Sequence, residues 1–167
     1  MTTEQDPVSP PSPPLVAPRL SLTGKQLVGI PLLAVIPLLT LLGVFGEGRT
    51  TTHVVSPAVD MRVVYPSRLR YRQIGLLEVA VRNVSGHTLD TLALSLDTAY
   101  VTRFSSVRIE PAPHLAYIVA LTAIKPRETR LVAAELWGQD HGSHTGHIVA
   151  TTPGDSVSSR IQTFVFP

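Results

Sequence analysis

The sequence predicts a mainly β protein, an antiparallel β-sandwich preceded by a single transmembrane α-helix. Two observations carry this prediction: an uncharged apolar stretch at residues 27–46, and strand-like alternation of apolar and polar side chains over most of the residues that follow. A third, the cluster of prolines near the start, marks off a separate segment. We therefore divide the chain into a Pro-rich arm (1–24), a transmembrane helix (25–47) and a β-sandwich domain (48–167).

The N-terminal arm has too few apolar side chains to form a core of its own. Prolines stand at positions 7, 10, 11, 13, 14 and 18. A segment of this composition does not bury enough surface to offset its chain entropy, so we expect a flexible arm with polyproline-II character. A PxxP-type ligand for a recognition domain is the alternative interpretation.

The apolar stretch reads LVGIPLLAVIPLLTLLGVFG from Leu27 to Gly46, and no charged residue occurs between Lys25 and Glu47. A helix rises about 1.5 Å per residue, so a stretch of this length spans about 30 Å, the thickness of the hydrocarbon core of a bilayer. The length of the stretch therefore predicts a membrane-spanning helix.

Two prolines interrupt the predicted helix, at Pro31 and Pro37. Each removes a backbone hydrogen bond and kinks the helix, and membrane helices tolerate this where a packed neighbour or a local adjustment satisfies the freed carbonyl. We therefore expect a packed partner beside the helix. A cleaved signal peptide is the alternative, but the apolar stretch is longer than usual and no A-x-A-like cleavage site follows it.

The charges beside the predicted helix favour one orientation. Arg19 and Lys25 precede it without an acidic residue between them, whereas Glu47 and Arg49 follow it. Positive charge is enriched on the cytoplasmic side of membrane helices. We therefore expect a single-pass protein of the cell (inner) membrane, with a cytoplasmic N-terminus and a C-terminal domain that is periplasmic or extracellular.

Period-two alternation predicts roughly seven or eight short strands after residue 50. The apolar positions expected on the buried faces of the first strands are Val59, Met61, Val63 and Tyr65; Leu77, Val79 and Val81; Leu92, Leu94 and Leu96; Val107 and Ile109; Tyr117, Val119 and Leu121; and Val132, Ala134 and Leu136. Two more strands are expected near 147–152 and 157–166. Turns are expected at 83–87, 125–129 and 153–155, an irregular or helical piece at 98–104, and a Gly-rich loop at 138–146. Phe104 and Trp137 are expected in the core.

Two sequences in this region carry a family resemblance. LEVAVRNVSG at residues 77–86, followed by a leucine-rich strand, and IKPRETRLV at residues 124–132 resemble bacterial immunoglobulin-like modules that are appended to membrane and surface proteins. The resemblance covers about 100 residues, without the cysteine pair of antibody-type domains. It implies an immunoglobulin-like β-sandwich used for adhesion, spacing or subunit contact rather than for catalysis.

Three histidines form the candidate metal site of the sequence. His141, His144 and His147 recur at a spacing of three, and imidazole is a good ligand for zinc, copper or nickel. In an extended strand this spacing places successive side chains on opposite faces, so only a curled loop brings all three together. A solvated hairpin loop without metal is therefore the favoured interpretation.

Three arginines form the candidate contact surface. Arg68, Arg70 and Arg72 alternate along the chain, so on a strand they project from one face, with Tyr65 and Tyr71 nearby. A positive stripe of this kind suits anionic lipid headgroups or an acidic patch on a partner subunit. The alternative is a charged strand face that resists aggregation.

Composition excludes several functional classes. The net charge of +2 and the lack of a nucleic-acid-binding signature argue against a nucleic-acid partner. The sequence has no cysteine, which excludes disulfides, thiolate zinc sites and iron–sulfur clusters. It has no G-x-S-x-G elbow, no phosphate loop and no suitably paired carboxylates, so we expect neither catalysis nor a cofactor. Asn83-Val-Ser85 matches a glycosylation sequon within a predicted turn.

These expectations lead to one functional hypothesis and one rival. The leading hypothesis is a non-catalytic, membrane-anchored accessory subunit of a multisubunit membrane complex. By analogy, we expect an energy-converting complex of the respiratory or the photosynthetic reaction-centre and light-harvesting kind. Its partners are then membrane lipids and other subunits, with candidate contacts at Pro31, Pro37 and the three arginines. The rival is a free-standing, membrane-tethered surface or periplasmic protein-binding module.

Overall fold

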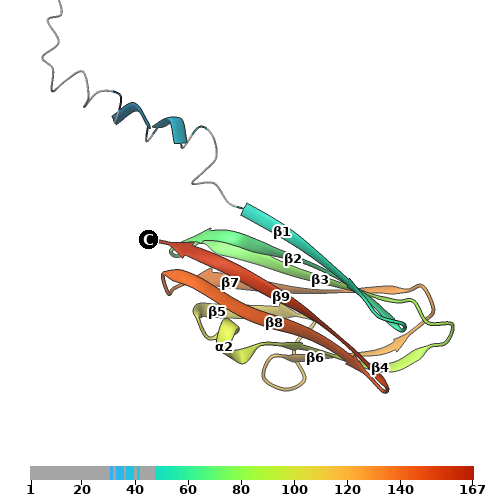
Figure 1. The fold of residues 1–167 in the computed structure, drawn as a ribbon. Coiled ribbons are helices and arrows are strands. Elements are labelled where there is room, and N and C mark those ends of the chain that lie inside the picture. Colours follow the sequence, from blue (N-terminus) through green and yellow to red (C-terminus); the bar gives the residue numbers. More distant parts are fainter. Residues whose placement is uncertain (1–30, 32, 36, 40, 42–47) are drawn as a thin grey trace, which may run out of the picture. The chain divides into compact units, whose positions relative to one another are not determined.

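The computed structural model describes residues 31, 33–35, 37–39, 41 and 48–167, and the chain divides into two compact units, Met1–Leu42 and Gly43–Pro167. In the first unit, the described positions between 31 and 41 are helical (Figure 1). Both Pro31 and Pro37 are among them and are exposed. Of the residues described, none belongs to a helix that is long and apolar enough to cross a membrane. The predicted arm and most of the predicted span, 25–47, lie outside the described residues and stay predictions.

The second unit consists of β-strands and one short helix (Figure 1). In chain order the elements are β1 (Gly48–Val55), β2 (Val59–Arg70), β3 (Ile74–Asn83), β4 (Leu89–Leu96), α2 (Thr98–Val101), β5 (Phe104–Glu110), β6 (Ile118–Ile124), β7 (Thr129–Gly138), β8 (Gly142–Thr152) and β9 (Asp155–Phe166). Neighbouring strands pair antiparallel, except where the end of β2 runs parallel to the end of β9. The prediction of a mainly β, antiparallel domain is confirmed.

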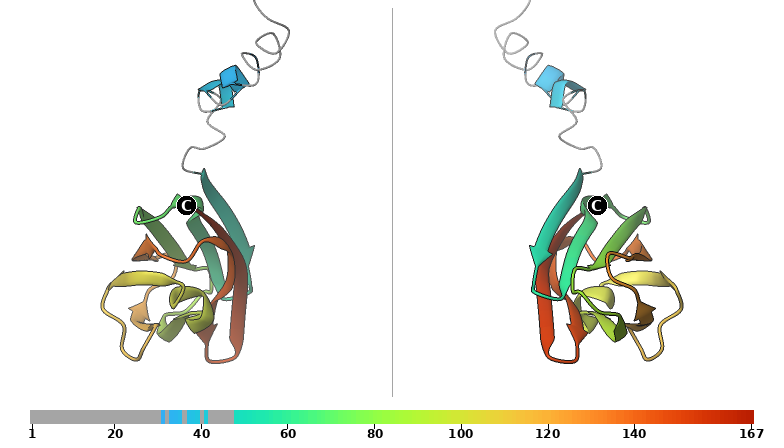
Figure 2. Two further views of the ribbon diagram at one scale, coloured as in Figure 1. Left: turned by 90° about the vertical axis from the view of Figure 1, so that its left-hand side faces the viewer. Right: turned by 90° about the vertical axis from the view of Figure 1, so that its right-hand side faces the viewer.

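The strands form two layers that pack face to face (Figures 1 and 2). One layer has the order β5-β7-β3-β2, with β1 paired to β2, and the other has the order β9-β8-β4-β6. The layers join at β2, which pairs with β3 over residues 59–64 and with β9 over residues 68–70. These orders correspond to strands D-E-B-A and G-F-C of an immunoglobulin sandwich, with β6 added beside β4. The domain is therefore an immunoglobulin-like β-sandwich, as the sequence predicts.

The core lies between the two layers and follows the predicted alternation. Every apolar position predicted for β2, β3, β4 and β7 is buried. Ile148 and Ala150 on β8 and Val157, Ile161 and Val165 on β9 complete the core from the second layer. Because side chains alternate between faces with a period of two, the polar residues between these positions lie on the outer faces of the sandwich.

Three predictions about this region are wrong or incomplete. Strand β1, of sequence GRTTTHVV, is missing from the prediction because its first residues lack an apolar alternation. Residues 138–146 are not one Gly-rich loop, since β8 already begins at Gly142. Trp137 is not in the core but 40% exposed, because its neighbours on β7, Leu136 and Gly138, take the inward positions. Phe104 is buried, as predicted.

Gly146 is needed on β8 because a core tyrosine lies against it. A Cβ atom at this position would lie 2.4 Å from the Cβ of Tyr100, a separation that real Cβ atoms essentially never show. The absence of a side chain therefore leaves room for Tyr100, a residue of the short helix α2, in the space between the layers. The hydroxyl of Tyr100 hydrogen-bonds Thr163 Oγ1 at 2.7 Å, and the Thr163 hydroxyl donates to the Pro66 carbonyl at 2.6 Å. Burial raises the pKa of Tyr100 to about 12, and the bond with Thr163 offsets part of the rise.

Side-chain hydrogen bonds of Asn83 connect the turn after β3 with the turn after β6. Its side chain is fully buried, and its Nδ2 donates to the carbonyls of His87 and Ile124 at 2.8 and 2.9 Å. Its Oδ1 accepts from the N–H and the hydroxyl of Ser85 at 2.9 and 2.6 Å. All hydrogen-bonding positions of the amide are thus used inside the protein. The sequon that Asn83 begins is therefore not accessible in the folded domain.

Candidate functional site

The predicted arginine stripe lies at one end of the sandwich, where β2 turns into β3. Arg68 and Arg70 are exposed at the end of β2, whereas Arg72 lies beyond the strand, in the turn, with a φ of 61°. The alternation therefore holds for the first two arginines only, because the chain leaves the strand at Tyr71. Tyr65 is buried in the core and does not join them.

Exposed aromatic and aliphatic side chains surround these arginines. Tyr71, Ile74, Trp137 and Phe164 are between 40% and 49% exposed. They converge because Ile74 pairs with Trp137 across β3 and β7, and Phe164 pairs with Arg68 across β9 and β2. We call this surface the arginine–aromatic end; its residues are Arg49, Arg68, Arg70, Tyr71, Arg72, Ile74, Trp137 and Phe164.

Ring contacts order part of this surface. The guanidinium carbon of Arg72 lies 5.3 Å from the centre of the Tyr71 ring, within the range of a cation–π contact. The Tyr71 ring also contacts the ring of His141, with 5.1 Å between the ring centres. Phe164 packs edge-on against Phe166, with 4.7 Å between the ring centres. The rings of Tyr71 and Phe164 therefore have neighbours that restrict their positions.

Backbone hydrogen bonds hold the turn between β2 and β3 against both layers. The Tyr71 N–H donates to the Phe166 carbonyl at 2.9 Å, and the Arg72 N–H donates to the Gly138 carbonyl at 2.8 Å. Gly138 in turn donates to the Gln73 carbonyl at 3.0 Å. A Cβ atom on Gly138 would lie 2.7 Å from the Arg70 carbonyl oxygen, so only glycine allows this close approach. The turn is thus fixed to the ends of β7 and β9.

Of the apolar side chains on this surface, sequence reasoning placed Tyr71 beside the arginines and missed Ile74, Trp137 and Phe164. The signal was present for Trp137, because the predicted inward set Val132, Ala134 and Leu136 places position 137 outward. For Phe164 and Ile74 no comparable signal existed, since their contacts arise from pairing between strands that are distant in sequence.

The three histidines of the candidate metal site do not converge. His141 and His147 are exposed, and His144 is half-buried, with its Nε2 2.7 Å from the Asp140 carbonyl oxygen. On β8, His144 takes the alternation phase of the inward-facing Ile148, whereas His147 takes the opposite phase. The strand thus separates these two side chains, as the spacing argument expects. In the part of the chain that the structure describes, no group of three or more histidines or carboxylates is placed to hold a metal ion.

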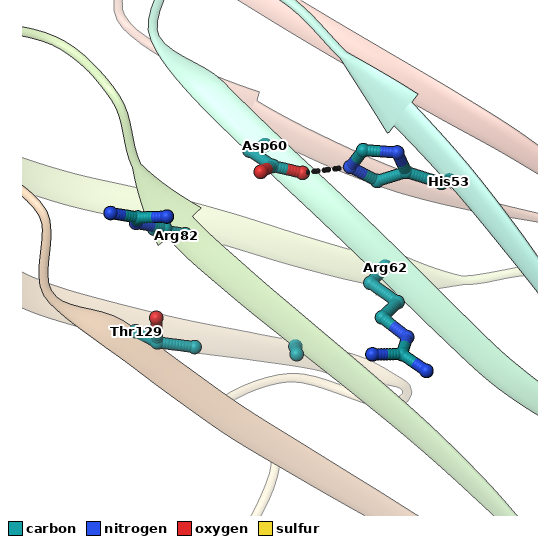
Figure 3. Close-up of a pocket in the computed structure, with 6 residues that line it drawn as sticks. His53, Asp60, Arg62, Arg82 and Thr129 are labelled. Carbon is teal, nitrogen blue, oxygen red and sulfur yellow. Dashed lines mark hydrogen bonds and ion pairs between the residues drawn. The ribbon is translucent and has the colours of Figure 1, made fainter.

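An open depression of about 500 Å³ lies on the outer face of the first layer (Figure 3). Its lining comes from β1, β2, β3 and the start of β7: His53, Asp60, Arg62, Ala80, Arg82 and Thr129. His53 Nε2 lies 2.5 Å from Asp60 Oδ1, which ties β1 to β2 at the rim. Figure 3 shows the guanidinium groups of Arg62 and Arg82 on either side of the depression. We call this surface the outer-face depression.

The surroundings of the depression combine apolar and charged groups. Val55 and Leu131, 59% and 58% exposed, stand in the same cross-strand rows as its lining, since Val55 pairs with Asp60 and Leu131 pairs with Ala80. Guanidinium groups suit carboxylates, and exposed apolar side chains beside them add area that a partner can bury. Chemically, the depression is suited to hold an acidic side chain of another protein.

Comparisons with known proteins find likenesses of fold only. No protein-family profile and no curated protein matches the sequence. Among solved structures, the chain is similar to the CARDB domain of PF1109 from Pyrococcus furiosus, in a complex with di-metal ions, at 13% identity and a TM-score of 0.45, covering 67% of this chain and 97% of that one. A cohesin module from a Clostridium perfringens family 33 glycoside hydrolase is similar at 5% identity and a TM-score of 0.45, covering 66% and 98%. The GAE domain of GGA2p from Saccharomyces cerevisiae is similar at 10% identity and a TM-score of 0.37, covering 72% and 98%. At these identities and scores the likeness carries nothing about function.

Proposed function

We propose that the protein is a non-catalytic, membrane-anchored accessory subunit whose sandwich binds another protein of the same membrane complex. The anchor is the apolar stretch from Leu27 to Gly46, and the sandwich then lies on the extracytoplasmic side. The observation that carries the binding role is the outer-face depression, with its two arginines and its apolar neighbours.

The depression supports a protein partner better than a small ligand. It is open and shallow, with lining residues from four strands of one sheet face, whereas small-molecule sites are concave and enclose most of their ligand. Arginine is enriched in protein interfaces, and the fully buried centre of an interface is more apolar than the rest of the surface. We therefore assign Arg62 and Arg82 the role of pairing with carboxylates of the partner, and Val55 and Leu131 the role of apolar contacts beside them.

Site-specific photo-crosslinking in the native membrane tests this assignment. A photoreactive residue at Thr129, which lines the depression, is expected to yield a crosslink to one membrane protein. The same residue at Thr145, an exposed threonine on the outer face of the second layer, is the matched control and is expected to yield none. The double change Arg62→Glu and Arg82→Glu should abolish the Thr129 crosslink, because it replaces both positive charges with negative ones.

Native purification distinguishes this proposal from its rival. After extraction in a mild detergent, an accessory subunit is expected to migrate with the crosslinked protein at fixed stoichiometry. Recovery of the chain only as a free monomer, with no crosslink from Thr129, contradicts the proposal. A crosslink to an envelope protein that is not retained in any membrane complex favours the free-standing binding module instead.

A further inference from the structure

We propose that the arginine–aromatic end of the sandwich seats on the headgroup layer of an anionic bilayer. This inference rests on the proposed membrane anchoring and names a second surface, separate from the outer-face depression. It assigns the bilayer itself as the occupant of that end.

The distribution of exposed rings is the first observation. In the described part of the chain, the exposed phenylalanine, tyrosine and tryptophan side chains are Tyr71, Trp137 and Phe164, and all three belong to this end. The aliphatic Ile74 lies beside Trp137 in the pairing of β3 with β7. Tryptophan and tyrosine concentrate at the membrane–water interface, where an apolar ring and a polar group each find a suitable environment.

The charge of this end is the second observation. Arg49, Arg68, Arg70 and Arg72 are exposed here. The nearby carboxylate of Asp140 lies 3.7 Å from a guanidinium nitrogen of Arg103, so an additional arginine faces it. Glu47 also directly precedes Gly48 in the sequence. Five arginines against two carboxylates leave an excess of positive charge, which complements the negative potential of a leaflet that contains anionic lipids.

The covalent path of the chain is the third observation. Gly48, the first residue of β1, pairs with Arg68 and so belongs to the arginine–aromatic end. The apolar stretch ends at Gly46, and two residues of chain extend over at most about 7 Å. If the stretch spans the bilayer, this end of the sandwich is held within about a Debye length of the headgroups. The far end, with the turns at 56–58 and 153–154, has no such constraint.

The turn at this end is built to keep its side chains in place. Backbone hydrogen bonds from Tyr71 and Arg72 reach β9 and β7, and Gly138 permits their close approach. A preformed surface loses less conformational entropy when it binds than a flexible one. Contact between this end and the headgroups therefore fixes the orientation of the sandwich, and of its outer-face depression, relative to the membrane.

The single tryptophan of the chain supplies the test, because its emission reports on this end alone. The full chain is reconstituted into nanodiscs that contain phosphatidylglycerol and lipids brominated near the top of the acyl chains. We expect the Trp137 emission to fall at least about twofold relative to unbrominated nanodiscs, and to be protected from the aqueous quencher acrylamide. In nanodiscs of phosphatidylcholine alone, both effects should be weaker.

Three variants provide the controls. The triple change Arg68→Ser, Arg70→Ser and Arg72→Ser should remove the dependence on phosphatidylglycerol. The triple change Lys125→Ser, Arg127→Ser and Arg130→Ser removes the same charge from the opposite end and should leave quenching unchanged. Moving the reporter with Trp137→Phe and Leu131→Trp, to the other end of strand β7, should abolish quenching by brominated lipid.

The outcomes separate this inference from the proposed function. If the chain enters the nanodiscs but Trp137 is quenched by acrylamide and not by brominated lipid, the seat is overturned and the anchor stands. If quenching is equal in both lipid compositions and insensitive to the arginine changes, the role of anionic lipid is overturned. If the chain does not enter nanodiscs at all, the membrane anchoring on which both proposals rest is wrong.

Discussion

The change Tyr100→Phe tests how the core is built, because it removes one buried hydroxyl without removing the ring. Near pH 7 the variant loses the 2.7 Å hydrogen bond between Tyr100 Oη and Thr163 Oγ1, whereas Thr163 keeps its own bond to the Pro66 carbonyl. A neutral hydrogen bond of this kind contributes about 1 kcal/mol to the free energy of unfolding. We therefore expect the variant to be less stable by about that amount at neutral pH.

The sign of this difference changes at high pH. Burial raises the pKa of Tyr100 from its ordinary value of 10.0 to about 12. Between these two values the unfolded chain binds fewer protons than the folded one, so the stability of the wild type falls as the pH rises above about 10. A difference of about two pKa units corresponds to a loss on the order of 2–3 kcal/mol by about pH 12. Phenylalanine has no proton to lose, so the variant is expected to become the more stable protein.

Urea unfolding of the full chain in a mild detergent measures both effects. The β-sheet circular dichroism signal is followed for wild type and variant at about pH 7, 9 and 11, and only the difference between the two proteins is interpreted. Lysines and arginines titrate in both proteins and cancel in this difference. A stability difference that stays constant across these pH values would show that the folded protein does not hold Tyr100 in its neutral form, and the reasoning fails.

Four further predictions concern other parts of the sandwich. Gly146→Ala should lower stability by about 1–3 kcal/mol in urea unfolding, because its Cβ collides with a buried tyrosine, whereas Gly86→Ala, with open space around it, should change little. Asn83→Ala should cost about 1–3 kcal/mol, and the wild type expressed in a glycosylating host should gain no mass from a glycan, since the amide is buried and bonded. Asp155→Asn should lower the urea midpoint near neutral pH, and this difference should shrink in acid. The Ser56 hydroxyl, then the Ala58 N–H, lower the pKa of the Asp155 carboxyl, so the stabilisation exists above its ordinary pKa and is lost as the pH falls through the lowered, folded-state pKa. Backbone amides of β1 should exchange hydrogen faster than those of β3, because its inward side chains are only partly buried.

The strands that sequence predicted well are those with a complete apolar face. In β3 the alternation of Leu77, Val79 and Val81 with Glu78 and Arg82 sets both the strand and its inward phase, and in β7 Val132, Ala134 and Leu136 recur with the same period of two. Strand β1 fails this criterion, since its inward positions are one glycine, two threonines and one valine. It is a strand because it pairs with the edge of β2. Local pattern identifies strands that fill the core, and it misses strands that only cover an edge.

The candidate site shows the same limit for function. The arginines at 68, 70 and 72 and the adjacent Tyr71 were evident from the sequence. Trp137 and Phe164 come from β7 and β9, which only the pairing of distant strands brings to this end. The depression around Arg62 and Arg82 has no sequence signature, because its residues lie on four strands. The pairing of strands determines which residues meet on both surfaces. The alternation within a single strand does not predict the order of strands in a sheet.

Strand β1 links the two proposed surfaces. It begins at the arginine–aromatic end with Gly48, and its His53 bonds Asp60 at the rim of the outer-face depression. Its Thr52 hydroxyl also bonds Ser159 on β9 at 2.7 Å, so β1 contacts both layers. While β1 stays paired with β2, the seat on the headgroups and the orientation of the depression are coupled. If β1 detached, its eight residues would become a tether of about 26 Å, and the same change would disrupt the rim of the depression. If both proposals hold, this weakly buried edge strand determines whether membrane contact and partner binding act together.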